Sequence, residues 1–449
     1  MKKGMTKLPS ARCLSLEDVE AHYRRSPLVS EICVLALRGE QLCAVVVPDF
    51  DRLRARRVAN AREAIRYELD NLGRELPADR RVCDYVLRAE PLPRAATPEL
   101  RRLELQRQLE AHGARARQPR AAAPLTEADR ALLDSPAGRA VVATLERQAG
   151  PAAALHPALN LEIDLGLDSL ARAEALLGVE HALGTEFDPR EAAAALTVGE
   201  LIALAGSQQA RSPAPAGPDL SWGNILGRAP ADLPELRPLL SPHPVRVMVV
   251  TALLRAVFLA ARVLLRLEVS GLEHVTRLER PFLVCPNHQS YLDPVIICST
   301  YPRALVPHVF HVGARDYFLN PFMARLSRWL NILPVDPDLT LLRALQASAA
   351  ALRAGKVLHI YPEGQRSFDG HLHEFKRGPA VLATGLGLPI VPAAIDGMHR
   401  VWARGERRVR PAKVRIRFGP PLTARGRSAD EVTEELKGRI ARMLAEMRK

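Results

Sequence analysis

The sequence predicts a multidomain chain: an α+β block, an all-α block of four helices and an α/β block, in that order. Its 449 residues exceed the length of one ordinary domain. The segment 207–245 contains SQQARSPAPAGPD and many further prolines, as linkers do. Helical spacing dominates in residues 124–206 just before this segment, and strand-like runs alternate with helices after it. We therefore place the blocks at residues 1–120, 124–206 and 246–449.

The first block combines both kinds of pattern. Residues 32–37 and 42–48 are short apolar runs next to glycine or proline, as strands are. Residues 16–25 and 58–72 have helical spacing. Together they indicate a small α+β unit.

The second block is rich in alanine and leucine, and its centre reads LNLEIDLGLDSL. Gly166 permits a turn, and Asp168 and Ser169 are residue types that favour the start of a helix. Residues 170–181 then continue with helical periodicity. This pattern is typical of a helical bundle with a turn before one of its helices.

The third block alternates strand-like and helical stretches, which indicates an α/β domain. Its candidate strands are residues 281–285, 357–361, 390–395 and 414–418, and its helix candidates include 339–354 and 429–447.

Residues 247–267 are mostly apolar but carry Arg255, Arg262 and Arg266. A membrane-spanning helix needs ~20 apolar residues, and an arginine at the bilayer centre costs roughly 2.5–3.5 kcal/mol. We therefore expect this helix to lie on a membrane surface with its arginines toward phosphates. The alternative is a helix buried in the domain whose arginines extend to solvent.

The 63 basic and 50 acidic residues give a net charge of +13. Such an excess suits anionic partners such as phospholipid headgroups, coenzyme A or nucleic acid, although high-GC codon bias explains an arginine excess equally well. Aromatic residues make up 4% of the chain, too few for base-stacking platforms, so we expect no nucleic-acid partner.

The six cysteines show neither CxxC spacing nor a disulfide rhythm, which predicts reduced thiols and no metal site. No apolar run follows the basic residues of MKKGMTKLPSARC, so we predict no secretory signal. The expected location is the cytoplasm, peripheral on the inner face of the membrane.

Two motifs in the third block carry the chemistry. In NHQSYLD, a histidine and a carboxylate stand five positions apart, at His288 and Asp293. Neutral imidazole can take a proton from an alcohol near pH 7, and Asp293 could bond the other ring nitrogen. In YPEGQRS, a turn at Glu363 and Gly364 precedes Arg366, which can hold a phosphate bidentately.

Lys376 and Arg377 add positive charge soon after the second motif. They serve either a phosphate site or an ordinary solvated basic face.

These residues resemble the glycerolipid acyltransferase family, which includes the 1-acylglycerol-3-phosphate acyltransferases. The resemblance covers about residues 265–430 and includes NHQSYLD, YPEGQRS, FKRG and the strand at 390–395. It implies that His288 is the general base and Asp293 its partner. It also implies that Glu363, Gly364 and Arg366 contact the acceptor phosphate or shape its site.

One stretch departs from the family pattern, which has a glycine and a later arginine between the two motifs. Asn331 stands in place of the glycine, and Pro337 falls where the arginine would be. Arg343 in the next helix could substitute for that arginine. The departure bears on the identity of the acceptor.

The segment LGLDSL resembles the prosthetic-group site of acyl carrier proteins, over about residues 125–206. The resemblance implies that Ser169 receives 4′-phosphopantetheine, whose thiol carries an acyl thioester. A helix N-terminus favours the added phosphodiester charge. The alternative is that Asp168 and Ser169 only cap a helix.

Residues 14–106 resemble the C-terminal subdomain of AMP-forming acyl ligases, through segments such as PLPR at 91–94. The family's catalytic lysine is absent, because Pro98 and Glu99 occupy the usual Gly-Lys positions. A carboxylate there cannot stabilise an acyl-adenylate as an ammonium would. We expect this block, which lacks the large nucleotide-binding domain, to be a relic or a docking site for a separate ligase chain.

The expected function is acyl transfer in phospholipid biosynthesis, from a carrier-bound or coenzyme A thioester to a hydroxyl of a lysophospholipid or glycerol-phosphate-type acceptor. Two alternatives stay open: a non-catalytic carrier and lipid-binding scaffold that partners a separate ligase, and acyl transfer to a non-glycerolipid acceptor.

Overall fold

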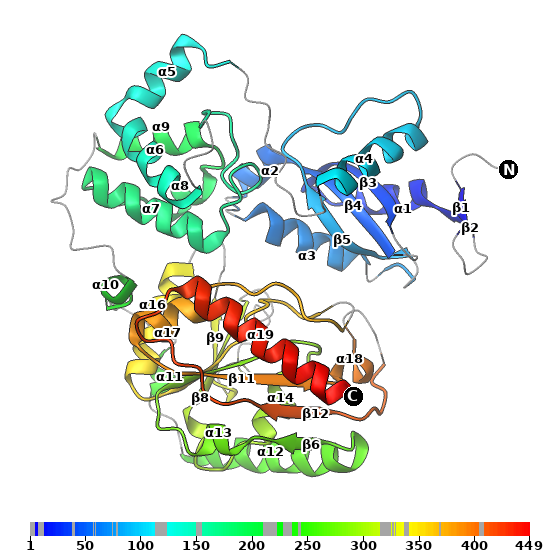
Figure 1. Ribbon diagram of the computed structural model, residues 1–449, viewed down its shortest axis with the longest axis vertical. Coiled ribbons are helices and arrows are strands. Elements are labelled where there is room, and N and C mark those ends of the chain that lie inside the picture. The colour runs from blue at the N-terminus through cyan, green and yellow to red at the C-terminus, as the bar shows by residue number, and fades with distance from the viewer. Residues whose placement is uncertain are drawn as a thin grey trace. The chain divides into compact units, whose positions relative to one another are not determined.

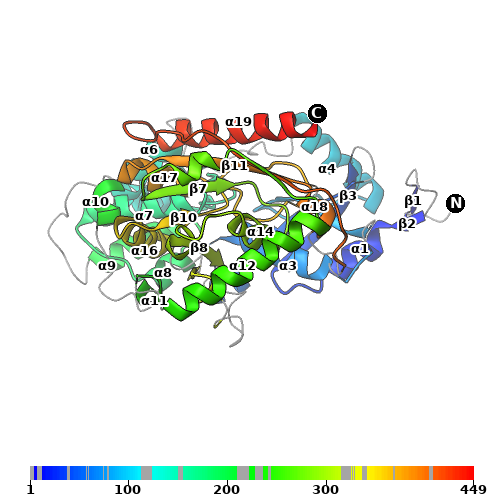
Figure 2. The same cartoon turned by 90° about the horizontal axis from the view of Figure 1, so that it is seen from below.

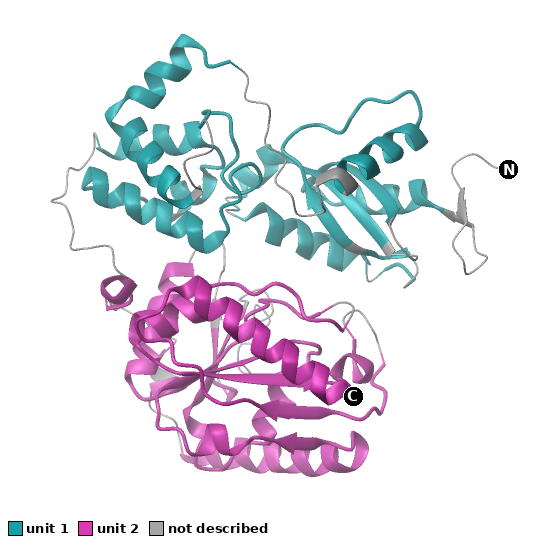
Figure 3. Cartoon of the chain, viewed as in Figure 1, with its two compact units in different colours: residues 1–218 teal, residues 219–449 magenta. Residues whose placement is uncertain are grey.

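The computed structural model forms two compact units, residues 1–218 and 219–449 (Figure 3). It describes residues 5–7, 13–37, 41–56, 58, 60–73, 75–77, 80–112, 124–149, 155–209, 222–227, 236–240, 244–314, 325, 327, 329–335, 341–367, 370–403 and 408–449. The division between the units falls inside the expected linker 207–245, much of which lies outside these residues.

The first part of unit 1 is a three-stranded sheet with helices on both faces (Figure 1). β3 (Val29–Leu37) pairs antiparallel with β4 (Gln41–Pro48), which pairs parallel with β5 (Val82–Leu87). Because side chains alternate along a strand, Ile32 and Val34 pack with residues of α1 (Leu16–Tyr23) and α3 (Ala61–Gly73). Cys33 and Leu35 face α4 (Pro98–His112) instead.

Three further elements complete this part of unit 1: β1 (Met5–Lys7), β2 (Cys13–Ser15) and α2 (Phe50–Ala55). The strand β5 has no counterpart among the elements expected from the sequence.

The second part of unit 1 consists of helices packed around a leucine-rich core. They are α5 (Glu127–Asp134), α6 (Pro136–Ala149), α7 (Ser169–Leu183), α8 (Pro189–Ala194) and α9 (Val198–Gln209). The described residues thus form five helices where the sequence predicted four. Ser135 separates α5 from α6 because it is extended (ψ 157°) and precedes a proline, which disfavours helical backbone before it.

Unit 2 is built on a seven-stranded sheet of order β6-β12-β11-β7-β10-β8-β9. The strands are β6 (Glu268–Ser270), β7 (Phe282–Pro286), β8 (Val309–Ala314), β9 (Ile332–Val335), β10 (Val357–His359), β11 (Ile390–Asp396) and β12 (Arg415–Phe418). β11 and β12 pair antiparallel, and every other neighbouring pair is parallel. The four candidate strands are all present, and β6, β8 and β9 are additional.

Helices cover both faces of this sheet. α12 (Pro244–Leu264) and α14 (Asp293–Ser299) pack on one face, and α19 (Ala429–Arg448) lies on the other (Figure 2). The remaining helical elements are α10 (Trp222–Gly227), α11 (Arg237–Leu240), α13 (Glu273–Thr276), η3 (Val306–His308), α16 (Leu341–Arg353), α17 (Gly378–Leu386) and α18 (Met398–Val401).

Helices α10 and α11 fall within the expected linker. α10 packs against α16 and α17, and Leu226 is fully buried. The Gln346 amide and the Arg353 guanidinium donate to the carbonyls of Ile225 (3.1 Å) and Leu226 (2.7 Å). Residues 222–227 are therefore part of unit 2.

Candidate active site and carrier site

The two sequence motifs of the third block meet at one edge of the sheet. β7 and β10 are parallel neighbours, so their C-terminal ends lie together. His288 follows β7, and the YPEGQRS segment follows β10. The Ser367 N–H donates to the His288 carbonyl oxygen at 2.7 Å, which joins the two motifs through their backbones. Ligands of open α/β sheets usually bind at such an edge.

His288 is held by Asp293, as the spacing predicts. The Nδ1 atom lies 2.8 Å from Asp293 Oδ2, and the same oxygen accepts the N–H groups of Gln289 (2.5 Å) and Ser290 (2.8 Å). A carboxylate is an acceptor only, so Nδ1 carries the proton and Nε2 is left as the basic nitrogen. The Asp293 side chain is fully buried, whereas that of His288 is 15% exposed.

The surroundings of His288 favour its neutral form. Burial lowers the pKa of the imidazole below its ordinary value, the bond to Asp293 raises it, and nearby Arg366 lowers it further. The balance lies below the ordinary pKa. The ring also stacks on Tyr361, with centroids 3.9 Å apart. A neutral, oriented imidazole can accept a proton from an alcohol.

Glu363 bonds backbone groups of two segments, which fits the second of its two expected roles, shaping the site. Its Oε1 accepts the N–H of His288 (2.8 Å), and its Oε2 accepts the N–H of His373 (2.9 Å). The side chain is 3% exposed, and burial raises the pKa of its carboxyl group. With both oxygens bonded to backbone, Glu363 shapes the site by fixing the loop that carries His288.

Gly364 occupies a backbone conformation that favours glycine, with φ +67°. A Cβ here would lie 2.8 Å from Cε of Lys376, whose exposed side chain passes directly over the turn. The Gly364 N–H donates to the Tyr361 carbonyl oxygen (3.0 Å), which closes the turn.

Arg366 lies beside the motif histidine and is 7% exposed. Its guanidinium carbon sits 3.2 Å from the ring centroid of Tyr291, an arrangement that adds cation–π attraction. Stacking occupies a face of the guanidinium, while its N–H donors point outward in its plane. The charge is therefore kept next to His288 in a fixed orientation.

Asn287, Gln289 and Tyr361 also build the site, although the sequence interpretation passed over them. Asn287 bonds both backbone groups of Ile395 in β11, at 3.0 and 2.7 Å. Gln289 donates to the carbonyl of Gly370 (3.2 Å) and accepts from the N–H of His399 (3.3 Å). All three residues lie inside the two sequence motifs, and this position was the signal that could have identified them as site residues. These amides tie the histidine loop to neighbouring segments.

Asn331 occupies a backbone conformation that favours glycine. Its φ is +52°, a region that asparagine tolerates better than most residues. Its side-chain amide donates to the Val309 carbonyl at 3.1 Å. Arg343 is exposed in the first turn of α16, and Pro337 lies outside the described residues. Asn331 is therefore a residue type that suits the backbone conformation at this position.

In unit 1, Ser169 is the first residue of α7. The N-cap residue Asp168 accepts the Ala171 N–H at 2.7 Å, so the cap is occupied by the aspartate. The Ser169 hydroxyl is partly exposed and receives a hydrogen bond from the Asn60 amide at 2.5 Å. Asn60 also caps α3 by accepting the Glu63 N–H at 2.9 Å.

Further contacts join the helical part of unit 1 to its α+β part around Ser169. The Glu162 carboxylate accepts the N–H groups of Ala61 (2.7 Å) and Arg62 (3.1 Å) at the start of α3. Arg54 of α2 donates to Glu200 of α9 at 2.7 Å. Burial raises the pKa of Glu162. We call this group of contacts the Ser169 interface.

The structure also describes Glu99, the residue that the sequence resemblance aligns with the ligase family's lysine. Glu99 is exposed in the first turn of α4. Arg102, one turn later, donates to the buried Glu20 carboxylate at 2.9 Å. By the sequence resemblance, the exposed Glu99 carboxylate stands where that ligase family has its lysine.

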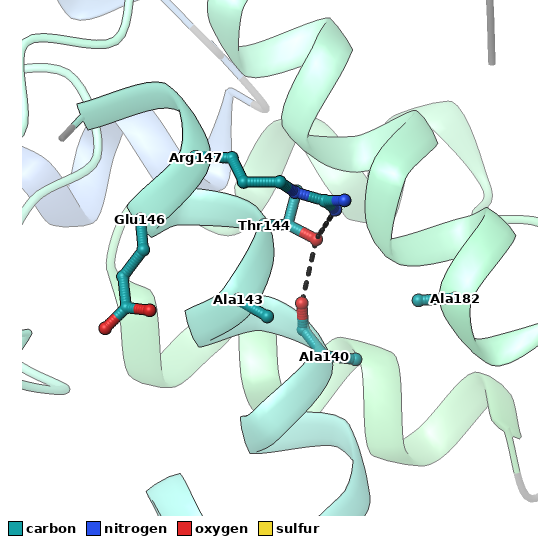
Figure 4. A pocket seen from close by; sticks show the side chains of 6 residues that line it. All are labelled: Ala140, Ala143, Thr144, Glu146, Arg147 and Ala182. Atoms are coloured by element: carbon teal, nitrogen blue, oxygen red, sulfur yellow. Dashed lines mark hydrogen bonds between the residues drawn. The ribbon is translucent and has the colours of Figure 1, made fainter. Parts of the chain in front are cut away.

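A surface hollow on the helical part of unit 1 lies apart from Ser169 (Figure 4). It is lined by Ala140, Ala143, Thr144, Glu146, Arg147 and Ala182. Ala182 is near the far end of α7 from Ser169, about 20 Å away at a rise of 1.5 Å per residue. The hollow is therefore not part of the Ser169 site.

Comparisons with known proteins identify two of the three blocks. Residues 266–396 match the Acyltransferase family, and residues 139–205 match the family described as "Phosphopantetheine attachment site". A 1-acyl-sn-glycerol-3-phosphate acyltransferase of Limnanthes alba is 28% identical over 175 residues, 38% of this chain and 59% of that protein. The mouse enzyme of that name, alpha form, is 30% identical over 187 residues, 40% and 64% respectively. The chain thus spans less than two thirds of the length of these relatives.

Solved structures were matched as well. The crystal structure of a 1-acyl-sn-glycerophosphate acyltransferase from Thermotoga maritima is 24% identical, with a TM-score of 0.39 over 47% of this chain and 86% of that one. The adenylation domain of a carboxylic acid reductase from Segniliparus rugosus is 25% identical, with a TM-score of 0.21 over 24% and 20%.

The family matches coincide with the motifs described above. The acyltransferase match includes His288, Asp293 and Arg366, and the attachment-site match includes Ser169. Residues 266–396 therefore form an acyltransferase domain related to the 1-acylglycerol-3-phosphate acyltransferases, and residues 139–205 form a phosphopantetheine-attachment domain of the same chain.

Proposed function

We propose that this protein transfers a fatty acyl group from a thioester to a hydroxyl of a lysophospholipid or glycerol-phosphate-type acceptor. The observation that carries the proposal is the His288–Asp293 contact of 2.8 Å, with Nε2 left as the basic nitrogen. The acceptor oxygen attacks the thioester carbonyl while Nε2 takes its proton. Collapse of the tetrahedral intermediate breaks the C–S bond, and the imidazolium returns the proton to the thiolate.

The charges around His288 support an acceptor that bears a phosphate. Arg366 is fixed against Tyr291 beside the histidine, and the Lys376 side chain crosses the adjoining turn. Guanidinium groups suit phosphates because their donors match two oxygens at once. In this proposal Arg366 and Lys376 hold the phosphate, while Glu363 and Gly364 shape the turn that places them.

Ser169 supplies the donor in this proposal, as the attachment point of 4′-phosphopantetheine. Its position at the start of α7 supports modification, since a helix N-terminus stabilises a phosphodiester. Free acyl coenzyme A, or a separate acyl carrier protein, would present the same thioester chemistry. The N-terminal block, with Glu99 in place of the lysine, would at most recruit a separate acyl ligase.

The test is a product assay with the full chain carrying its phosphopantetheine group. Acyl transfer is measured to lysophosphatidate, to glycerol 3-phosphate and to a monoacylglycerol that lacks the phosphate. We expect an ester product from a phosphorylated acceptor and little from the monoacylglycerol. Equal turnover of the monoacylglycerol would contradict phosphate recognition. Acyl loading without transfer to any acceptor would instead support a scaffold.

The pH dependence of transfer should reflect the lowered pKa of His288. The base is active when neutral, so a lowered pKa keeps it active at pH values where an ordinary histidine, with a pKa of about 6.5, would be protonated. We expect kcat/KM to fall on the acid side with a midpoint below 6.5. A midpoint at or above that value would contradict the assigned base. Thioester hydrolysis without enzyme is subtracted at each pH.

Helix α12 supports contact with a membrane surface. It is long and apolar enough to span a bilayer by length and composition, which for a single helix is weak evidence. Thr251, Leu254 and Ala261 are buried on its inner side, against the domain core. Leu259 and Val263 are 66% and 77% exposed. One face thus belongs to the domain and the other presents apolar side chains, as in helices that lie in the interface.

Changing Leu259 and Val263 together to glutamate should weaken vesicle binding roughly 100-fold or more, because each buried aliphatic side chain contributes about 1.5–3 kcal/mol. Cosedimentation with vesicles of anionic phospholipid measures the effect. Val409→Glu is the matched control, since Val409 is also exposed (57%) but lies outside the helix. Unchanged binding by the double variant would rule out this face as the contact.

The Ser169 interface should slow modification of the serine. Asn60→Ser removes the donor to the Ser169 hydroxyl while keeping a residue that can cap α3. A neutral hydrogen bond contributes about 0.5–1.5 kcal/mol, so we expect phosphopantetheinylation to speed up roughly 2–10-fold. Intact mass is followed over time with coenzyme A and a phosphopantetheinyl transferase.

Arg54→Ala is the companion variant, because it breaks the Glu200 contact without touching Ser169. Faster modification in both variants would assign the effect to docking as a whole. If only Asn60→Ser is faster, the hydrogen bond itself is responsible. Identical rates in both variants and the unaltered protein would contradict the prediction.

A further inference from the structure

A compact cluster inside unit 2 is formed by Cys298, His311 and His359. It lies next to Tyr361, whose ring stacks on His288. The three cluster residues come from three different elements: α14, β8 and β10. Cys298 Sγ lies 3.4 Å from His311 Nε2 and 3.8 Å from His359 Nδ1. Cys298 and His359 are buried, and His311 is partly buried.

The spacing of these atoms matches a tetrahedral metal site. With bonds of about 2.3 Å to sulfur and about 2.0–2.1 Å to nitrogen, tetrahedral angles place sulfur and nitrogen about 3.6 Å apart. The two observed separations, 3.4 and 3.8 Å, lie on either side of that value. All three ligand atoms are within 4.8 Å of one another. One ion can therefore be reached by all three after small side-chain rotations.

Unsatisfied polar atoms gather around the same cluster. His311 Nδ1, His359 Nε2 and the hydroxyls of Tyr301 and Tyr361 are buried, and none has a hydrogen-bond partner among the described residues. The Tyr361 and Tyr301 rings lie 5.2 and 6.4 Å from the His359 ring. Native interiors leave few such atoms unpaired. The two ring nitrogens in this group are the ones turned away from Cys298, so an ion held through His311 Nε2 and His359 Nδ1 would leave them to bond further polar groups such as ordered water.

Two of the three groups are already in the form that binds a metal, and the third must lose a proton to do so. Burial lowers the pKa of His311 to about 4 and that of His359 well below its ordinary value, so both imidazoles are neutral. Burial raises the pKa of Cys298 to about 12, so its thiol keeps its proton unless a cation replaces it. Metal binding therefore releases that proton to solvent and forms a thiolate ligand.

We propose that Cys298, His311 and His359 bind one divalent transition metal ion of the zinc type. Thiolate with imidazole selects such ions over magnesium or calcium, and three protein ligands leave one position for water. The ion would join α14, which begins at Asp293, to the strands β8 and β10. Tyr361 lies between His359 and His288, so by fixing His359 the ion would help to hold the ring on which the proposed base stacks. This is a positioning role and does not depend on the acyl chemistry.

The test uses the full chain, stripped of metal and then titrated with Co²⁺, whose thiolate complexes absorb through charge transfer from sulfur. We expect the thiolate-to-cobalt band to saturate at one equivalent in the unaltered protein. The band should disappear in Cys298→Ser. Cys285→Ser is the matched control, because Cys285 is a fully buried thiol in the same domain outside the cluster. Elemental analysis of zinc-loaded samples should give the same stoichiometry.

A second readout keeps the test valid if Cys298→Ser folds poorly. Zinc should raise the unfolding temperature of the unaltered protein and of Cys285→Ser, but not that of His311→Gln, whose side chain is only partly buried. If the unaltered protein shows neither a cobalt band nor a thermal shift, the proposal is overturned. The cluster would then bind water and no metal ion. A band retained by both Cys298→Ser and His311→Gln would assign the ion to other groups and overturn the proposal equally.

Discussion

Replacing His288 with alanine is expected to lower kcat/KM for acyl transfer about 10²–10⁴-fold, the usual contribution of a general base. The fall should appear in kcat, because the variant keeps Arg366 and Lys376 for the acceptor. Steady-state rates with lysophosphatidate and an acyl thioester measure it. Equilibrium binding of lysophosphatidate should change little. Transfer that persists at the original rate would remove His288 from the mechanism.

Two controls separate chemistry from packing at His288. Tyr361→Phe keeps the ring that stacks on the imidazole and should retain most of the activity. Asp293→Asn should lose activity, because an amide can donate to Nδ1 and thereby favour the wrong tautomer. Asp293 also accepts two backbone N–H groups, so circular dichroism and thermal unfolding must accompany this variant. Loss of activity in Tyr361→Phe equal to that in His288→Ala would indicate that the Tyr361 hydroxyl is itself needed for the reaction.

Replacing Ser169 with alanine is expected to abolish phosphopantetheinylation, because no other hydroxyl stands at that position. Intact mass after incubation with coenzyme A and a phosphopantetheinyl transferase should show one added group in the unaltered protein and none in Ser169→Ala. The cap residue Asp168 remains, so α7 should form in both. A full mass increase in Ser169→Ala would place the attachment elsewhere.

The same variant distinguishes the two thioester donors. If the carrier supplies the acyl group, Ser169→Ala loses transfer from the loaded chain but keeps the acyltransferase domain intact. If free acyl coenzyme A is the donor, its turnover is the same in Ser169→Ala and the unaltered protein. Single-turnover transfer from acylated protein, followed without added acyl coenzyme A, separates these outcomes. Failure of the loaded chain to acylate any acceptor would rule out transfer from its own carrier.

The sequence predicts the active-site geometry well because the relevant contacts are local or set by sheet topology. His288 and Asp293 are five residues apart on one loop, so their contact needs no distant element. The second motif follows a strand that was also expected, and parallel pairing of β7 and β10 brings the two together. The strands themselves were detectable because each is a short apolar run.

Contacts between residues distant in the sequence could not be anticipated in this way. Cys298, His311 and His359 converge only because α14, β8 and β10 are neighbours, and β8 was not among the expected strands. The bond between Asn60 and Ser169 spans two separately expected blocks. For Glu363, the motif indicated importance but not orientation, and only the fold shows that both oxygens meet backbone N–H groups.

The carboxylate of Glu363 has a consequence for how this site can change. One side chain holds the backbone at His288 and at His373, so a shift in either segment alters the support of the other. Substitutions on the two sides are therefore expected to show epistasis, with combined effects that differ from the sum of the single ones. A change of acceptor preference would accordingly require matched changes in both segments, through selection or design, while Glu363 stays in place.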